Sequence, residues 1–365
     1  MNRPATLLLL MLTFTSVPSL AETRLTGALP RVNDKPLETL GGVDTEYGEL
    51  RTSDGARLRT LVTRPQGAKG KLPAIQYIQP LSCDTIEIPA EGGDGWSRML
   101  RAVITQSHAL VLRVEKSGVG DSLGVPCAQL DYETELAHHR AALSYLRGRS
   151  DVDVARIVLL GGSMGSNYAP LVARGQPVAG VAVWGGGART WYERQIAFDR
   201  RALELGDHPA DDIASAMMRY AEFEFLYLQK GLSPAEIARQ RPDIADVWGQ
   251  IVGTEGTLQY GRPIAFHQQA QRQNWVGAWQ AVKAPVLVLL GEYDWFEEPR
   301  SAELIARIVN RQAPGTAEFH LIPHMDHHFS LYPSAEAAFR GENGTPDPRR
   351  ALNFLLPWME ERTRS

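Results

Sequence analysis

The stretch RIVLLGGSMG at residues 156–165 decides the fold, because it joins an apolar strand to a serine flanked by glycines. Residues 156–160 are largely aliphatic, as expected for a strand buried on both faces. Ser163 follows at a predicted strand-to-helix turn, where a sharp bend keeps the hydroxyl exposed and leaves no room for neighbouring side chains. The helix start would direct free backbone N–H groups at a developing oxyanion. The motif alone is a modest signal, since a glycine-rich turn can also carry an inert serine.

Strand and helix patterns alternate on both sides of this turn. The predicted strands span residues 47–52, 57–63, 73–79, 109–115, 156–160, 178–184, 285–290 and 317–322. The predicted helices span residues 96–105, 131–147, 300–311 and 348–361. Such alternation predicts a mostly parallel central sheet with helices on both faces.

The alternation stops between residues 189 and 282, where helical periodicity dominates and aromatic residues gather. We interpret residues 189–282 as a helical cap inserted into a core made of residues 22–188 and 283–365. The cap aromatics are expected mainly to pack its interior. A second interpretation, which the sequence leaves open, is that some of them line an apolar pocket above Ser163.

Two further residues complete a candidate catalytic group. A serine hydroxyl is a weak nucleophile without a base, and the base needs an acid to orient it. Asp294 follows the predicted strand at 285–290, and His327 follows the one at 317–322. Residues at the carboxyl ends of parallel strands gather at one edge of a sheet. Ser163, Asp294 and His327 are therefore predicted as nucleophile, acid and base, in the chain order Ser, Asp, His.

In these features the chain resembles the α/β-hydrolase superfamily from residue 47 to the C-terminus, most of all its bacterial esterase and serine-aminopeptidase-like branches. The segment VEKSGVGDSLG at 114–124 is similar to the family's glycine-rich turn after the fourth strand. GEYD at 291–294 resembles its acid turn, and DHHF at 326–329 its histidine turn. The resemblance implies an α/β-hydrolase fold with the cap inserted before the acid-bearing strand.

One position departs from the family pattern. The family usually has His-Gly after the third strand, where a backbone N–H completes the oxyanion hole, whereas this chain has Gln79-Pro80-Leu81. Pro80 has no N–H to donate. The resemblance places the donor on Leu81, and the second N–H would come from Met164, the residue after the nucleophile.

The two cysteines are Cys83 and Cys127. The same resemblance brings the third and fourth strands close together, and the cysteines lie on the loops that leave them. A disulfide that pins the oxyanion loop is therefore expected, with two unpaired thiols as the alternative.

The N-terminus is predicted to direct export. Residues 1–21 combine Arg3, an apolar run and small residues before Ala21, which is typical of a signal peptide cleaved near Ala21–Glu22. The sequence thus predicts a secreted or periplasmic protein with no membrane span after cleavage.

The expected function is hydrolysis of a carboxylic ester or related acyl bond in a small-molecule substrate, without a cofactor. A formal net charge of −4 and the lack of a Lys/Arg block argue against a nucleic-acid partner. The oligomeric state is not predicted. Two alternatives stay open: a non-catalytic binding protein on the same fold, and a serine-aminopeptidase-like peptidase. The acids that could recognise a substrate amine in the peptidase are Glu193, Glu222 and Glu224.

Two further motifs are weaker. His320, His324, Asp326, His327 and His328 lie close together, but an H-x-H-x-D-H zinc motif would need His at position 322, which is Ile. The glycines of residues 118–124 are not followed by a helix that could receive a pyrophosphate. No metal or nucleotide site is therefore predicted.

Overall fold

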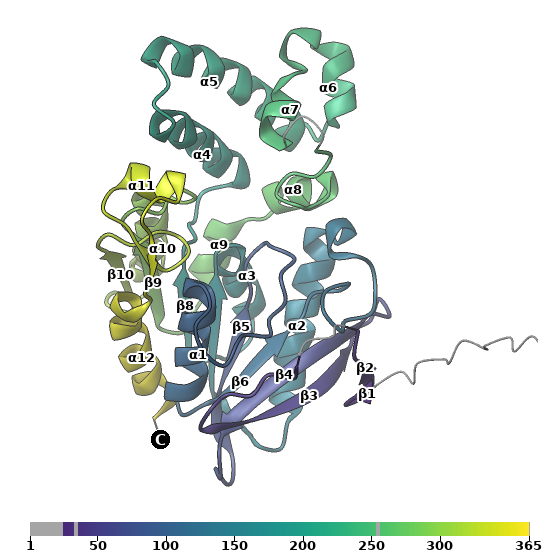
Figure 1. The fold of residues 1–365 in the computed structure, drawn as a ribbon, viewed down its shortest axis with the longest axis vertical. Helices are drawn as coiled ribbons and strands as arrows, with labels where there is room; N and C mark the ends of the chain where they lie inside the picture. The colour runs from purple at the N-terminus through teal and green to yellow at the C-terminus, as the bar shows by residue number, and fades with distance from the viewer. Residues whose placement is uncertain (1–24, 33–35, 253–255, 365) are drawn as a thin grey trace, which may run out of the picture.

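The computed structural model describes residues 25–32, 36–252 and 256–364. The predicted signal peptide, residues 1–21, lies outside this range. Within it the chain forms a central twisted sheet with helices on both faces and a separate group of helices above one end (Figure 1).

The central sheet has eight strands in the order β10-β9-β8-β7-β5-β6-β4-β3. Every neighbouring pair from β10 to β6 is parallel, and β4 and β3 add an antiparallel edge. The strands are β3 (Val43–Arg51), β4 (Arg57–Pro65), β5 (Leu72–Ile78), β6 (Leu110–Val114), β7 (Val152–Gly162), β8 (Gly180–Trp184), β9 (Val286–Gly291) and β10 (Ala317–Ile322). Each matches a predicted strand, so the predicted mostly parallel sheet is confirmed.

The main helices on the two faces of the sheet are α1 (Gly95–Gln106), α2 (Tyr132–Gly148), α3 (Met164–Ala173), α10 (Pro299–Gln312) and α12 (Arg349–Thr363). Strand β7 shows why both faces are apolar. Ile157 and Leu159 belong to the core under α2, α3 and α10, whereas Val158 and Leu160 belong to the core under α1 and α12. Side chains of a strand alternate between faces, so a strand buried on both reads as a continuous apolar run.

The stretch between β8 and β9 is helical, as expected for a cap. It contains α4 (Trp191–Leu205), α5 (Ala210–Glu224), α6 (Pro234–Gln240), α7 (Val247–Val252), α8 (Ile264–Gln271) and α9 (Trp275–Ala281). In Figure 1 helices α4 to α8 stand beyond the end of the sheet, while α9 returns to its face. We call residues 189–282 the cap.

Several short elements were not predicted. They are β1 (Leu25–Thr26), β2 (Leu29–Pro30), β11 (Ser330–Leu331), α11 (Ala335–Arg340) and β12 (Thr345–Pro346). Two-residue strands carry no periodicity that a sequence pattern could reveal. Among the helices of the described residues, none has the length and apolar character needed to cross a membrane.

Candidate active site

Ser163 lies at the turn between β7 and α3, in a backbone conformation that few residues adopt. Its φ is 53° and its ψ is −120°. Its N–H donates to the carbonyl oxygen of Trp184 at 2.7 Å, which fixes the turn against β8. A Cβ on Gly161 would lie 2.4 Å from the carbonyl oxygen of Gly165, and one on Gly165 would lie 2.0 Å from that of Ile78. Backbone contacts therefore require these glycines around Ser163.

His327 and Asp294 meet at the ends of β10 and β9. Nδ1 of His327 lies 2.7 Å from Oδ2 of Asp294, and both residues are buried. Because a carboxylate can only accept, Nδ1 carries the hydrogen, and Nε2 of the neutral ring is left with its lone pair. The second carboxylate oxygen, Oδ1, accepts the backbone N–H groups of Phe296 at 2.9 Å and Glu297 at 3.0 Å. The Asp294 carboxylate is thus held in place on both oxygens.

Gly185, the first residue after β8, leaves the space that the imidazole fills. Its φ is 67°, and a Cβ there would lie 2.6 Å from Cε1 and 2.8 Å from Nδ1 of His327. Beside it, Nε1 of Trp184 donates to the carbonyl oxygen of His327 at 2.9 Å. Gly185 was not predicted as a site residue, although a run of three glycines directly after a strand (residues 185–187) indicates a close approach of other groups to the backbone.

Replacing Gly185 with alanine is expected to displace the imidazole and lower ester turnover by about 10²-fold, because misplacing a catalytic group by about 1 Å has that effect. Gly175→Ala is the matched control: Gly175 also has a positive φ of 71° but nothing lies within 4 Å of the added Cβ. Steady-state kinetics on both variants compares the two. Equal activity in both would mean that the contact with His327 does not matter.

Ser163 and His327 line one cavity of about 420 Å³, together with Met164 and Leu81. The cavity is lined by residues of both the sheet end and the cap. Its aromatic lining comprises Tyr77, Trp96, Trp191, Tyr260, Trp275 and Phe296. Other cap aromatics are fully buried in the hydrophobic core that the cap shares with the sheet, namely Phe223, Tyr227, Phe266 and Trp279. Both interpretations of the cap aromatics therefore hold, for different residues.

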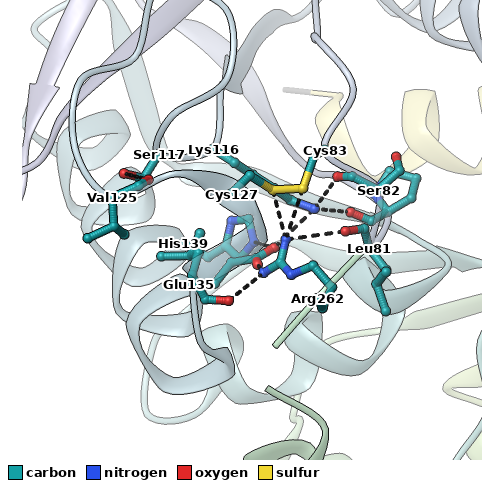
Figure 2. Close-up of a disulfide and its surroundings, with 12 residues drawn as sticks. Leu81, Ser82, Cys83, Lys116, Ser117, Val125, Cys127, Glu135, His139 and Arg262 are labelled. Atoms are coloured by element: carbon teal, nitrogen blue, oxygen red, sulfur yellow. Dashed lines mark hydrogen bonds and ion pairs between the residues drawn. A yellow bond between two sulfur atoms is a disulfide. The ribbon is translucent and has the colours of Figure 1, made fainter. Parts of the chain in front are cut away.

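The loop after β5 is held by the expected disulfide. Cys83 and Cys127 are joined with their Cα atoms 5.9 Å apart, and the strands before them, β5 and β6, pair in parallel. In the view of Figure 2, Arg262 of the cap lies below the disulfide. Its Nη1 donates to the carbonyl oxygen of Leu81 at 3.3 Å and lies 3.1 Å from Sγ of Cys127. The disulfide and Arg262 of the cap therefore both hold the loop after β5 in place.

The three acids considered for amine recognition lie elsewhere in the cap. Glu193 caps the N-terminus of α4, Glu222 pairs with Arg241, and Glu224 is buried inside the cap. Of the described residues, those that line the cavity do not include these three acids. The cavity contains other carboxylates, of which Glu297 is buried beside Asp294, and burial raises the pKa of Glu297.

The histidines of residues 320–328 do not converge. Nε2 of His320 lies 2.8 Å from Glu318, Nδ1 of His324 lies 3.0 Å from the Tyr293 hydroxyl, and His327 faces Asp294. Across residues 25–32, 36–252 and 256–364, no three His, Cys, Asp or Glu side chains are grouped so that they could hold a metal ion.

The sheet order and the strand-turn-helix at Ser163 define a class of protein, and solved structures agree with it. The chain has the α/β-hydrolase fold. It is similar to carboxyl esterase 2 of the mycorrhizal fungus Tuber melanosporum, with 14% identity, a TM-score of 0.54 and coverage of 90% of each chain. It is also similar to the α/β-hydrolase GrgF of Penicillium sp. sh18, with 15% identity, a TM-score of 0.53 and coverage of 88% of this chain and 99% of that one.

A third similar structure is an esterase of Pyrococcus furiosus, with 11% identity, a TM-score of 0.51 and coverage of 90% of this chain and 96% of that one. No protein-family model matches the sequence, and no curated protein does. At these identities the similarity establishes the fold, and the chemistry has to be argued from the site.

Proposed function

We propose that the protein is a serine hydrolase that cleaves a carboxylic ester or related acyl bond through Ser163, His327 and Asp294. The observation that carries the proposal is the 2.7 Å contact between Nδ1 of His327 and Oδ2 of Asp294, beside a serine held at a strained turn on the same cavity. A base oriented by a carboxylate, on the same cavity as a serine hydroxyl, is the combination that nucleophilic acyl transfer needs. The esterases of the same fold agree with this chemistry.

In the first half of the reaction, Nε2 of His327 takes the proton of Ser163 as Oγ bonds to the acyl carbon. The carbonyl π bond becomes an oxyanion. The tetrahedral intermediate then collapses, the C–O bond to the alcohol breaks, and His327 returns the proton to the leaving oxygen. In the second half, His327 takes a proton from water, which attacks the acyl-enzyme, and Ser163 recovers its proton as the acid leaves. Asp294 holds the ring in one tautomer throughout.

The oxyanion is proposed to bind two backbone N–H groups, those of Met164 and Leu81. Met164 is the first residue of α3, where an N–H has no partner within the helix. Both residues line the cavity that contains Ser163. Preorganised donors of this kind each contribute about 10²–10³ to kcat in serine hydrolases.

A small molecule with an apolar or aryl part is the substrate class that the cavity favours, because about 420 Å³ lined by aromatic rings matches the size and character of small-ligand sites. Ester hydrolysis is preferred to peptide hydrolysis, because the three acids proposed to recognise a substrate amine, Glu193, Glu222 and Glu224, are not among the residues that line the cavity. A nucleic-acid partner and a cofactor form no part of the proposal.

We also propose that the mature protein works outside the cytoplasm. The Cys83–Cys127 disulfide supports this, because such bonds persist in oxidising compartments. The signal-like residues 1–21 support it independently.

The nucleophile is tested with a fluorophosphonate probe, followed by peptide mass spectrometry. The adduct is expected on Ser163 and not on Ser82 or Ser97, which line the same cavity, because in the proposed mechanism His327 activates the Ser163 hydroxyl alone. A panel of short aryl esters and aminoacyl anilides then separates esterase from peptidase. An unlabelled Ser163 in folded protein would contradict the proposal, whatever the outcome of the panel.

A further inference from the structure

The loop that carries the Leu81 N–H has three consecutive carbonyl groups that face buried cations. Nζ of Lys116 donates to the carbonyl oxygens of Pro80 and, at 2.7 Å, of Ser82. Nη1 of Arg262 donates to the carbonyl oxygen of Leu81, between them. Figure 2 shows both cations approaching this loop beside the disulfide. The carbonyl directions of residues 80–82 are therefore set by side chains outside the loop.

The contact at Pro80 bears on the oxyanion hole through the geometry of one peptide unit. The carbonyl of Pro80 and the N–H of Leu81 belong to the same amide plane, and in a trans peptide they point in opposite directions. The described residues contain no cis peptide bond. When Lys116 binds the Pro80 oxygen, the Leu81 N–H must point away from Lys116, and Leu81 lines the cavity with Ser163.

The charge of Lys116 is balanced in the interior. Lys116 is 3% exposed, and its Nζ lies 3.3 Å from Glu135 of α2, which also pairs with Arg262. Burial lowers the pKa of Lys116 to about 8, although Glu135 and Asp84 favour the ammonium form, and Arg262 lowers it further. Burial by itself would raise the pKa of Glu135, but Lys116 and Arg262 hold it below its usual range.

We propose that Lys116, as its ammonium form, is a positioning residue for the reaction: by binding the Pro80 carbonyl it aims the Leu81 N–H at the oxyanion, with Arg262 holding the next carbonyl. This inference rests on the proposed function. It also accounts for the Pro80 departure from the family pattern. Pro80 has no N–H but keeps its carbonyl, and the carbonyl is the group that Lys116 uses.

The test compares Lys116→Met with Lys116→Arg, and follows kcat, KM and thermal unfolding. Lys116→Met is expected to lower kcat by about 10–10²-fold with KM within about 3-fold, because an oxyanion donor acts mainly in the transition state. Binding of a boronic acid, which mimics the tetrahedral intermediate, should weaken in parallel with kcat. Arg59→Met is the matched control, since Arg59 is equally buried but pairs with Asp121 at 3.2 Å.

The pH dependence separates positioning from mere stability. The wild-type kcat is expected to fall as the pH rises past about 8, where Lys116 loses its charge. Lys116→Arg keeps a charged donor at all these pH values and should lack that alkaline decline. Since these two proteins do not depend on the folding of Lys116→Met, the comparison stays decisive even if that variant is unstable.

Each result either supports or overturns the inference. A Lys116→Met enzyme that is less stable but keeps the wild-type kcat, or an alkaline decline shared by the wild type and Lys116→Arg, would overturn it. Fluorophosphonate labelling of the wild type tells this failure from that of the proposed function. If Ser163 is labelled and the Lys116→Met variant keeps the wild-type kcat, only the positioning role of Lys116 is disproved.

Discussion

Ester turnover is expected to fall by at least roughly 10³-fold when Ser163 is replaced by alanine, with the fold intact. The residual rate would come from binding and from the oxyanion donors alone. The fold should survive because alanine keeps the Cβ and removes only the hydroxyl. Measurement of kcat/KM on an aryl ester, with circular dichroism as a check of folding, tests this. Undiminished turnover in a folded Ser163→Ala protein would remove Ser163 from the mechanism.

Ser163→Gly sharpens the same experiment, because it separates chemistry from backbone strain. At φ 53° and ψ −120°, a residue with a Cβ is strained by about 1–3 kcal/mol, and glycine is not. Both variants should therefore be inactive, while the glycine variant unfolds at a higher temperature than the alanine variant. A protein that holds its nucleophile in a strained turn gives up stability for a fixed hydroxyl direction.

The centre of the sheet could be predicted from the sequence because strands such as β6, β8 and β9 are buried on both faces. Residues 157–160 of β7 are apolar on both faces, so the run shows no competing periodicity. Asp294 and His327 could be placed because a parallel sheet brings its strand ends together. The choice of His327 among the neighbouring histidines came from the resemblance of residues 326–329 to the family's histidine turn.

The support of the oxyanion loop could not be predicted in the same way. Arg262 lies 127 residues after Glu135, and it joins Lys116 and Glu135 because the cap folds back over the loop after β5. Nothing local distinguishes Arg262 from a solvated cap arginine, because its burial depends on packing between the cap and the core. Gly185 was missed for a similar reason, since its role depends on the position of His327.

The cap contains a second feature that the sequence did not reveal, a buried pair of carboxyl groups. Asp199 of α4 is 9% exposed and Glu224 of α5 is fully buried. Oδ2 of Asp199 and both carboxyl oxygens of Glu224 have no hydrogen-bond partner among the described residues. Burial raises the pKa of Asp199 to about 7, against the attraction of Arg194. Burial, and then Asp199 itself, raises the pKa of Glu224 well above its usual range.

These carboxyl groups should make the cap less stable as the pH rises. A group whose pKa is raised in the folded state contributes stability that is fully present below its unfolded pKa and is lost as the pH rises through the folded pKa. For Asp199 this window runs from about 4 to about 7, and the contribution lost is about 4 kcal/mol. Glu224 extends the loss to higher pH. Tyr260 and Tyr220 also face Asp199, but burial raises their pKa values, so they stay neutral in this window.

Asp199→Asn should therefore remove the part of this pH dependence that Asp199 contributes, because an amide does not ionise, while Glu224 keeps its own part. The difference in unfolding temperature between variant and wild type is expected to grow between pH 5 and pH 8, with the variant more stable at pH 8. Glu204→Gln, an exposed acid on the same helix, is the matched control and should leave a constant difference. Hydrogen exchange should place the wild-type loss in α4 and α5. A difference that stays flat across this range would mean that Asp199 ionises as freely in the folded cap as in the unfolded chain.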